Sequence, residues 1–239
     1  MKKQIKVTLI VIVAAIIAAA IIWYVMYLRG KEQDLLTPVG TRAEFIGDTD
    51  KYPTMLTAKG TRILNADGEQ VVLKGVMVPE SRSLYEEKKF NEDFYKDVFA
   101  KGGNAIRVPI SPVEYKNDDY YMWRYLDRIV TWAGENDNYV ILDWDYTGNP
   151  IDGSGDEMPD LDENPLDYSA EFWKNIADYF KNTPNVIFEI YNEPVGMSDS
   201  EWKRCAESLI GVIRDAGAKQ LIICLLYTSD AADDLTRVD

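Results

Sequence analysis

Short apolar runs alternate along the chain with longer segments whose apolar residues recur at helical spacing. The runs have the length and the β-branched and aromatic composition of strands buried on both faces, and they lie at residues 71–76, 102–109, 139–144, 186–191 and 221–223. Between them, apolar residues at intervals of three and four predict helices over residues 91–101, 120–136, 169–181 and 199–216. Because strands and helices alternate, the pattern predicts an α/β fold with a parallel sheet and crossover helices.

The N-terminal segment has a different pattern, a long apolar stretch without interruption. Residues 7–28 contain no charged side chain, and at about 1.5 Å per residue they can cross a hydrocarbon core of about 30 Å. Lysines precede the stretch, Arg29 follows it, and Trp23 and Tyr27 lie near its end, where interfacial aromatic residues belong. We therefore predict that residues 1–31 are an uncleaved signal anchor in the cell membrane, with the following domain outside the cell. A cleaved signal peptide, which would make the protein secreted, and a buried core helix are the alternatives.

The segment after the apolar stretch is predicted to be a linker. Residues 32–52 lack helical or strand periodicity and include proline and glycine. The folded domain is predicted to span residues 53–223. It opens with two alternating runs around Asp67 and Gly68, a dipeptide that indicates a hairpin turn.

The C-terminal segment breaks the alternation of strands and helices. After the fifth run, no segment with an apolar helical face follows. The sequence CLLYTSDAAD, which begins at Cys224, resembles an in-frame translation of a transposase adapter used to prepare sequencing libraries. Residues 224–239 are therefore predicted to be a non-native tail, and the native chain is expected to continue beyond the fifth strand.

Acidic residues outnumber basic ones by 40 to 26, which gives the chain a formal net charge of −14. This charge disfavours nucleic acids and anionic membrane surfaces as partners, and it suits a domain that acts on a neutral polymer. The two cysteines, Cys205 and Cys224, are too few for a disulfide framework and lack zinc-site spacing. The acidic loop over residues 148–165 lacks the spacing of an EF-hand, so neither a metal nor a cofactor is predicted.

The fourth apolar run carries the candidate chemistry. Residues 186–194 read VIFEIYNEP, so Asn192 and Glu193 directly follow the end of a buried strand. In parallel α/β folds, the C-terminal ends of the strands form the face where chemistry is done. A carboxyl that is fixed there and partly desolvated can hold a proton near neutral pH, as a general acid must.

This ending resembles the fourth-strand signature of glycoside hydrolase family 5, the cellulases and their relatives, which have a (β/α)8-barrel (TIM-barrel) fold. Three further stretches resemble the family's first, second and third strands in the same order: VVLKGV at 71–76, GGNAIRVP at 102–109 and YVILDW at 139–144. The resemblance covers roughly residues 53–223. It implies a barrel that is incomplete here, with about five of its eight βα units.

The resemblance also implies roles for individual residues. Glu193 corresponds to the general acid/base, Asn192 to the residue that contacts the substrate's 2-hydroxyl, and Arg107 to the arginine that orients the nucleophile carboxylate and lowers its pKa. A structural ion pair is the alternative for Arg107, since a charge within a buried strand must be paired, and a structural carboxylate is the alternative for Glu193. The family's nucleophile is a glutamate on the seventh strand, which this sequence does not reach. Glu189 is a poor substitute, because it lies about 13 Å lower along the barrel than Glu193.

The third strand departs from the family pattern at Asp145. The family motif usually ends there in histidine, and this sequence contains no histidine. Asp145 is nevertheless a candidate for contact with sugar hydroxyls. Trp144, Tyr146 and Tyr191 are candidates for stacking on the faces of sugar rings, with plain core packing as the alternative.

These features predict a retaining glycosidase, membrane-anchored or secreted, that cleaves β-linked glucans as an endoglucanase or cellulase does. We expect a monomer whose partner is a polysaccharide, and we expect the fragment itself to be inactive because it lacks the seventh-strand carboxylate. The alternative is a non-catalytic carbohydrate-binding protein on a degenerate barrel, which the missing histidine keeps open. A glutamate on the seventh strand of the full-length chain would favour the enzyme, and its absence the binding protein.

Overall fold

The computed structural model describes residues 2–36, 51–155, 161 and 163–225. It divides into two compact units, residues 1–38 and residues 39–239. The first unit consists of helix α1 (Lys2–Leu36). Its segment Val11–Gly30 has a mean hydropathy of 2.6 and is long and apolar enough to cross a membrane, as a signal anchor or a signal peptide would. The helix continues past the predicted start of the linker, and most of the predicted linker lies outside the described residues.

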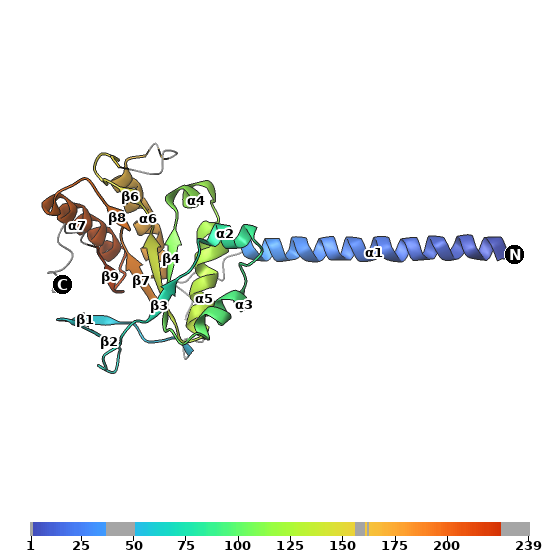
Figure 1. Cartoon of the computed structure of the whole chain (residues 1–239), viewed down its shortest axis with the longest axis horizontal. Coiled ribbons are helices and arrows are strands. Elements are labelled where there is room, and N and C mark those ends of the chain that lie inside the picture. Colours follow the sequence, from blue (N-terminus) through green and yellow to red (C-terminus); the bar gives the residue numbers. More distant parts are fainter. Residues whose placement is uncertain (1, 37–50, 156–160, 162, 226–239) are drawn as a thin grey trace. The chain divides into compact units, whose positions relative to one another are not determined.

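The second unit is built on a parallel sheet of five strands (Figure 1). The strands are β3 (Gly75–Met77), β4 (Ala105–Ile110), β5 (Tyr139–Trp144), β7 (Val186–Glu189) and β9 (Ile222–Ile223), in the order β3-β4-β5-β7-β9. Each of these strands pairs with the next one along the chain, as the strands of a (β/α)8 barrel do. The parallel sheet predicted from the sequence is confirmed.

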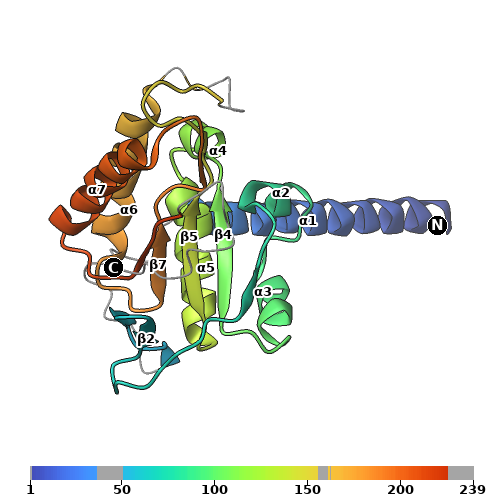
Figure 2. The ribbon, with the colours of Figure 1, turned by 60° about the vertical axis from the view of Figure 1, so that its left-hand side comes forward.

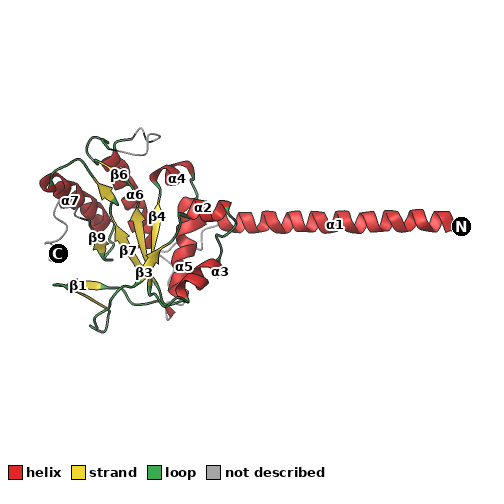
Figure 3. Ribbon diagram, viewed as in Figure 1, coloured by secondary structure: helices red, strands yellow, loops and turns green. Residues whose placement is uncertain are grey.

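Helices connect the strands and cover one face of the sheet (Figures 2 and 3). They are α2 (Ser81–Glu86), α3 (Glu92–Phe99), α4 (Pro112–Asn117), the π-helical turn η2 (Met122–Leu126) that runs into α5 (Asp127–Glu135), α6 (Pro165–Phe180) and α7 (Asp199–Asp215). Side-chain caps fix where several of them begin, as at α3 and α7. Asn91 accepts a hydrogen bond from the N–H of Phe94 at the start of α3, and Ser198 and Glu201 form a capping box at the start of α7.

Alternation along the strands separates two faces of the sheet. Even-numbered residues such as Val108 and Trp144 belong to a large apolar cluster that packs against the helices. Odd-numbered residues such as Ala105 and Tyr139 belong to a smaller cluster at the N-terminal ends of the strands. Farther along the strands the odd-numbered face becomes polar, beginning at Arg107. Polar side chains therefore lie on the C-terminal part of the odd-numbered face, which is the inner face of the sheet.

A hairpin closes the N-terminal end of the inner face. Strands β1 (Thr57–Lys59) and β2 (Arg62–Leu64) pair antiparallel, and Ile63 packs against the smaller apolar cluster. The turn predicted around Asp67 and Gly68 is present, but beyond it β2 makes only an isolated bridge, between Leu64 and Gln70. The regular ladder of the hairpin is formed with the preceding segment instead.

The first barrel strand begins at Gly75, later than the predicted start at residue 71. The backbone just before Gly75 forms hydrogen bonds with the side chain of Asn104. Asn104 Oδ1 accepts from the N–H of Lys74 at 2.7 Å, and its Nδ2 donates to the carbonyl of Val72 at 3.0 Å. A Cβ atom on Gly75 would lie 1.8 Å from the carbonyl oxygen of Ala105. Only glycine therefore allows β3 to pair this closely with β4.

Three helical segments differ from the sequence prediction. The short helices α2 and α4 were not predicted, because six residues do not display a helical period. Helix α6 begins at Pro165, four residues before the predicted start at Ser169. Asn164 is its N-cap and proline occupies its first position, a signal that was available in the sequence.

Candidate active site

Two short strands extend the ladder at the C-terminal edge of the sheet. β6 (Thr147–Gly148) follows β5, β8 (Glu193–Pro194) follows β7, and the two pair in parallel with Thr147 opposite Glu193. The N–H of Glu193 donates to the carbonyl of Tyr146 at 3.0 Å. The backbone of Glu193 is therefore fixed by strand pairing, although the residue lies beyond the main strand.

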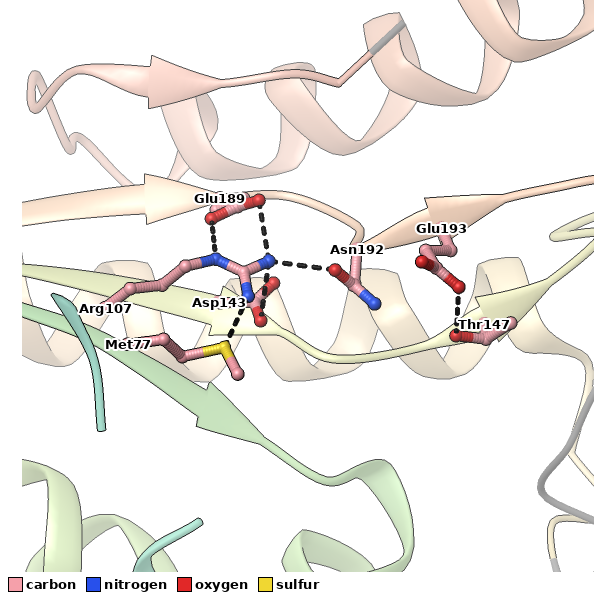
Figure 4. A network of polar contacts seen from close by, with 7 residues as sticks. All are labelled: Met77, Arg107, Asp143, Thr147, Glu189, Asn192 and Glu193. Carbon is pink, nitrogen blue, oxygen red and sulfur yellow. Dashed lines mark hydrogen bonds and ion pairs between the residues drawn. The ribbon is translucent and has the colours of Figure 1, made fainter. Parts of the chain in front are cut away.

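Arg107 is the centre of a polar network on the inner face (Figure 4). Its guanidinium binds the Glu189 carboxylate with two prongs, Nε to Oε2 at 2.7 Å and Nη2 to Oε1 at 2.9 Å. Nη2 also donates to Asn192 Oδ1 at 2.8 Å and lies 3.0 Å from Asp143 Oδ2. Nη1 contacts Met77 Sδ at 3.0 Å. Strands β3, β5 and β7 thus each place one side chain around a guanidinium that β4 supplies, and Asn192 adds a fourth from the segment after β7.

The network bears on both interpretations of Arg107. The structure brings Arg107 and Asn192 together, and it gives Arg107 the structural ion pair that was the alternative to a role at the nucleophile. Hydrogen bonding to Glu189 raises the pKa of Arg107 above its ordinary value, against the opposing effect of burial. The guanidinium is therefore a permanent cation, with 24% of its side chain still exposed.

Glu193 lies on the far side of Asn192 from the guanidinium (Figure 4). Its Oε2 accepts a hydrogen bond from Thr147 Oγ1 at 3.2 Å, and the residue is half-buried. A carboxyl that is held through one oxygen can present the other to a ligand. This is the arrangement that a proton donor to a glycosidic oxygen needs.

Two more carboxyls, Asp145 and Glu80, follow strands at this edge. Asp145 follows β5, and burial raises its pKa; Glu193 and Glu80 add to the increase, while Arg107 opposes it. Glu80 follows β3, where its Oε1 accepts from the hydroxyl of Tyr121 at 2.8 Å and its Oε2 caps α2. Asp145 was a candidate from the sequence, but Glu80 was not, because nothing in the sequence indicated that α2 begins there.

Asp143 is the member of the network that the sequence did not single out. Its side chain is fully buried. The pKa of Asp143 is raised from 3.8 to about 8, mainly by burial; Glu189 contributes to the increase and Arg107 opposes it. The register pairs Asp143 with Glu189 across β5 and β7. A charged residue at an odd-numbered position of a strand whose neighbour carries Arg107 on the same face was the available signal.

The three aromatic residues proposed for sugar stacking lie in the core. Trp144, Tyr146 and Tyr191 are at most 1% exposed. Trp144 stacks on Phe172 with ring centroids 3.9 Å apart, and Tyr146 stacks on Tyr191 at 5.3 Å. Rings covered on both faces by protein cannot stack on a sugar. The structure therefore corrects this expectation in favour of the packing alternative.

Within the described ranges, no group of three or more acidic, cysteine or histidine side chains is arranged to hold a metal ion. Cys205 is buried on α7 and Cys224 is exposed, and both are free thiols. The carboxyl, amide and guanidinium groups at the sheet edge can transfer protons and form hydrogen bonds. Residues 156–160 and 162 of the acidic loop before α6 lie outside the described residues.

Comparison with known proteins identifies relatives of this chain. The family model described as Cellulase (glycosyl hydrolase family 5) matches residues 64–235. Endoglucanase A of Butyrivibrio fibrisolvens is 31% identical over 207 residues, which cover 79% of this chain and 42% of that protein. Endoglucanase C of Evansella cellulosilytica is 25% identical over 228 residues, which cover 79% and 27%. The chain thus spans less than half the length of these curated relatives.

Solved structures show the same fold. The native form of a beta-glucanase from Saccharophagus degradans matches with a TM-score of 0.69 at 23% identity, over 79% of this chain and 60% of that one. The same enzyme in complex with cellotetraose matches with a TM-score of 0.67 at 25% identity, over 76% and 56%. The predicted (β/α)8 fold is confirmed, and β3, β4, β5, β7 and β9 form the described part of the sheet.

Proposed function

The chain belongs to glycosyl hydrolase family 5, the cellulase family, and on that premise we propose that the protein is a retaining glycosidase that hydrolyses β-linked glucans. The proposal includes an endoglucanase-like mode of action. It draws on the endoglucanases among the relatives and on the beta-glucanase that was solved with cellotetraose.

One observation carries the proposal: Glu193 is fixed at the C-terminal edge of the sheet while its carboxyl remains half-buried. In this position Glu193 protonates the leaving oxygen in the first step and activates water in the second. A retaining enzyme also needs a carboxylate nucleophile about 5–5.5 Å away. We assign that role to the seventh-strand glutamate that the family resemblance implies.

Arg107 and Asn192 support this chemistry in the proposal. Asn192 is held by the Arg107 guanidinium at 2.8 Å, which leaves its amide nitrogen available to a sugar hydroxyl. Arg107 itself is oriented by Glu189. With both prongs of Glu189 engaged, the cation is fixed and can stabilise negative charge on the inner face.

The remaining elements of the proposal concern location. We place the catalytic domain outside the cell, tethered to the membrane through residues 7–28. The supporting feature is the apolar segment of α1, which is long enough to span a bilayer. A secreted protein released by cleavage of this segment is the other outcome, and extraction of membranes with high salt and then detergent distinguishes the two.

Substitution of the proposed acid tests the proposal. In the whole protein, Glu193→Gln keeps the shape of the side chain and removes its proton, so hydrolysis of unactivated β-glucans should fall by roughly 10²–10⁴-fold. Aryl glycosides with good leaving groups should lose much less in the glycosylation step, because they need no protonation. Glu207→Gln, at an exposed glutamate on α7, is the matched control and should leave both rates unchanged.

Two results would contradict the assignment. An equal loss on both substrate classes would remove Glu193 from the acid/base role. Binding of cellotetraose by the unmodified whole protein without turnover of any substrate would favour the non-catalytic binding protein.

A further inference from the structure

The Nη2 nitrogen of Arg107 has more acceptors around it than hydrogens to give. Three oxygen atoms lie within 3.0 Å of it: Glu189 Oε1 at 2.9 Å, Asn192 Oδ1 at 2.8 Å and Asp143 Oδ2 at 3.0 Å. A guanidinium Nη carries two hydrogens. At most two of the three oxygens can therefore receive a hydrogen of their own.

The geometry identifies Asp143 as the acceptor left out. Both Nη2 hydrogens are directed at Glu189 and Asn192, with which they form hydrogen bonds. Neither oxygen of Asp143 has a hydrogen-bond partner among the residues that the structure describes. Asp143 thus lies close to the cation without a hydrogen bond to it, although its side chain is fully buried.

An ionised Asp143 would be energetically unfavourable in this position. The single charge of Arg107 is already balanced by the two-pronged pair with Glu189. A second buried carboxylate without a hydrogen-bond donor would carry a large desolvation cost. A neutral carboxylic acid avoids the cost of the unpaired charge and leaves both Nη2 hydrogens with Glu189 and Asn192.

We propose that Asp143 is a positioning residue for Asn192, which stays bound to Arg107 while Asp143 is a neutral acid and loses the Nη2 hydrogen to Asp143 when Asp143 ionises. The exchange follows from the strength of the competing bonds, since a carboxylate is a stronger acceptor for a guanidinium than an amide oxygen is. Asn192 immediately precedes Glu193, so its release disturbs the edge where the reaction is placed. The catalytic consequence rests on the proposed function, whereas the exchange itself does not.

The charged groups that face Asp143 come from each element packed against it. They are Arg107 on β4, Glu189 on β7 and Asp145 at the end of its own strand. The pKa of Asp143 is raised to about 8, mainly by burial; Glu189 and Asp145 contribute to the increase and Arg107 opposes it. Asp145 in turn faces Glu193 and Glu80. The proton of Asp143 is therefore lost in a mildly alkaline range.

Side-chain NMR on the full chain in detergent micelles tests the exchange without any need for turnover. The probes are the ¹³Cγ signal of Asp143, identified by its loss in Asp143→Asn, and the side-chain amide signals of Asn192, identified by their loss in Asn192→Ser. The Asp143 signal should titrate with a midpoint at about pH 8. The Asn192 signals should move with the same midpoint.

Variants separate this coupling from a general effect of pH. In Asp143→Asn the Asn192 signals should stay constant across the Asp143 transition, because the competing acceptor no longer ionises. Asp178→Asn, the same change at an exposed position of α6, should leave the Asn192 titration as it is in the unmodified chain. Titration of Asp143 in the range ordinary for aspartate would overturn the proposal. So would Asn192 signals that ignore the Asp143 transition, or that still move with it in Asp143→Asn.

Activity measurements carry the test to the reaction. In the whole protein, kcat/KM on a β-glucan should fall about tenfold between about pH 7 and about pH 9 from the loss of the Asp143 proton. Asp143→Asn should show a smaller fall, and an unchanged fall would overturn the positioning role. If no substrate is turned over at any pH while the NMR coupling holds, the proposed glycosidase function fails and the exchange at Arg107 stands.

Discussion

Replacement of Asp143 by asparagine should stabilise the folded chain, and the gain should grow with pH. The pKa of Asp143 in the folded protein is raised from 3.8 to about 8. Between these values the native chain keeps a proton that the unfolded chain has released. The contribution of this group to stability is therefore fully present below the unfolded pKa and is lost as the pH rises toward about 8.

The size of the effect follows from linkage. One bound proton changes the free energy of unfolding by about 1.4 kcal/mol for each pH unit. Asparagine does not titrate, so the difference between Asp143→Asn and the unmodified chain should rise by about 2.7 kcal/mol from about pH 5 to about pH 7. Above about pH 8 the difference should level off. Both side chains are neutral in this window, so the charge at position 143 beside Arg107 is the same in the two proteins.

Urea unfolding of both proteins in the same detergent at several pH values measures this slope. The slope is more informative than the difference at one pH, because any change in packing caused by the new amide adds a constant. Asp178→Asn is the matched control for the loss of an exposed carboxyl. A difference in unfolding free energy that stays flat from about pH 5 to about pH 7 would show that Asp143 is ionised in the native state, and the reasoning would fail.

Two further predictions concern the N-cap of α7 and the apolar N-terminal segment. Ser198→Ala removes the capping box at the start of α7, and it should lower the free energy of unfolding by about 1 kcal/mol in urea titrations; no measurable change would indicate that the box adds nothing to α7. If residues 7–28 are an anchor, the expressed protein should stay with membranes through a high-salt wash and come off only in detergent, whereas mature protein beginning near residue 29 in the medium would show that the segment is cleaved.

Much of the fold could be predicted from local patterns in the sequence. The bounds of β5 were predicted correctly, because the run consists mainly of aliphatic and aromatic residues and has the length of a buried strand. The start of the first barrel strand was missed because it depends on Asn104, a side chain distant in sequence that occupies the backbone of residues 72–74. Local propensity carries no information about such a contact.

The candidate site was predicted only in part for a similar reason. Motif resemblance indicated Glu193, Asn192 and Arg107, and the structure places the last two in direct contact. It gave no indication of Asp143, because the burial and the crowding that hold its proton arise from three strands at once. The contact of Glu80 with Tyr121 also depends on tertiary structure, since it needs α2 and η2 to meet.

The third strand shows how a residue can determine the site without touching a ligand. Trp144 lies between two aspartates in sequence, yet it points to the helices, where it stacks on Phe172 and donates from Nε1 to Ser169 Oγ at 2.8 Å. A slip of one residue would turn Asp143 and Asp145 into the apolar layer and bring the indole against the Arg107 guanidinium. Both changes are unfavourable, since the carboxyls would lose the cation and the indole N–H would lose its buried acceptor. The buried tryptophan therefore sets the register that brings Asp143 to the cation and Asp145 to the edge beside Glu193.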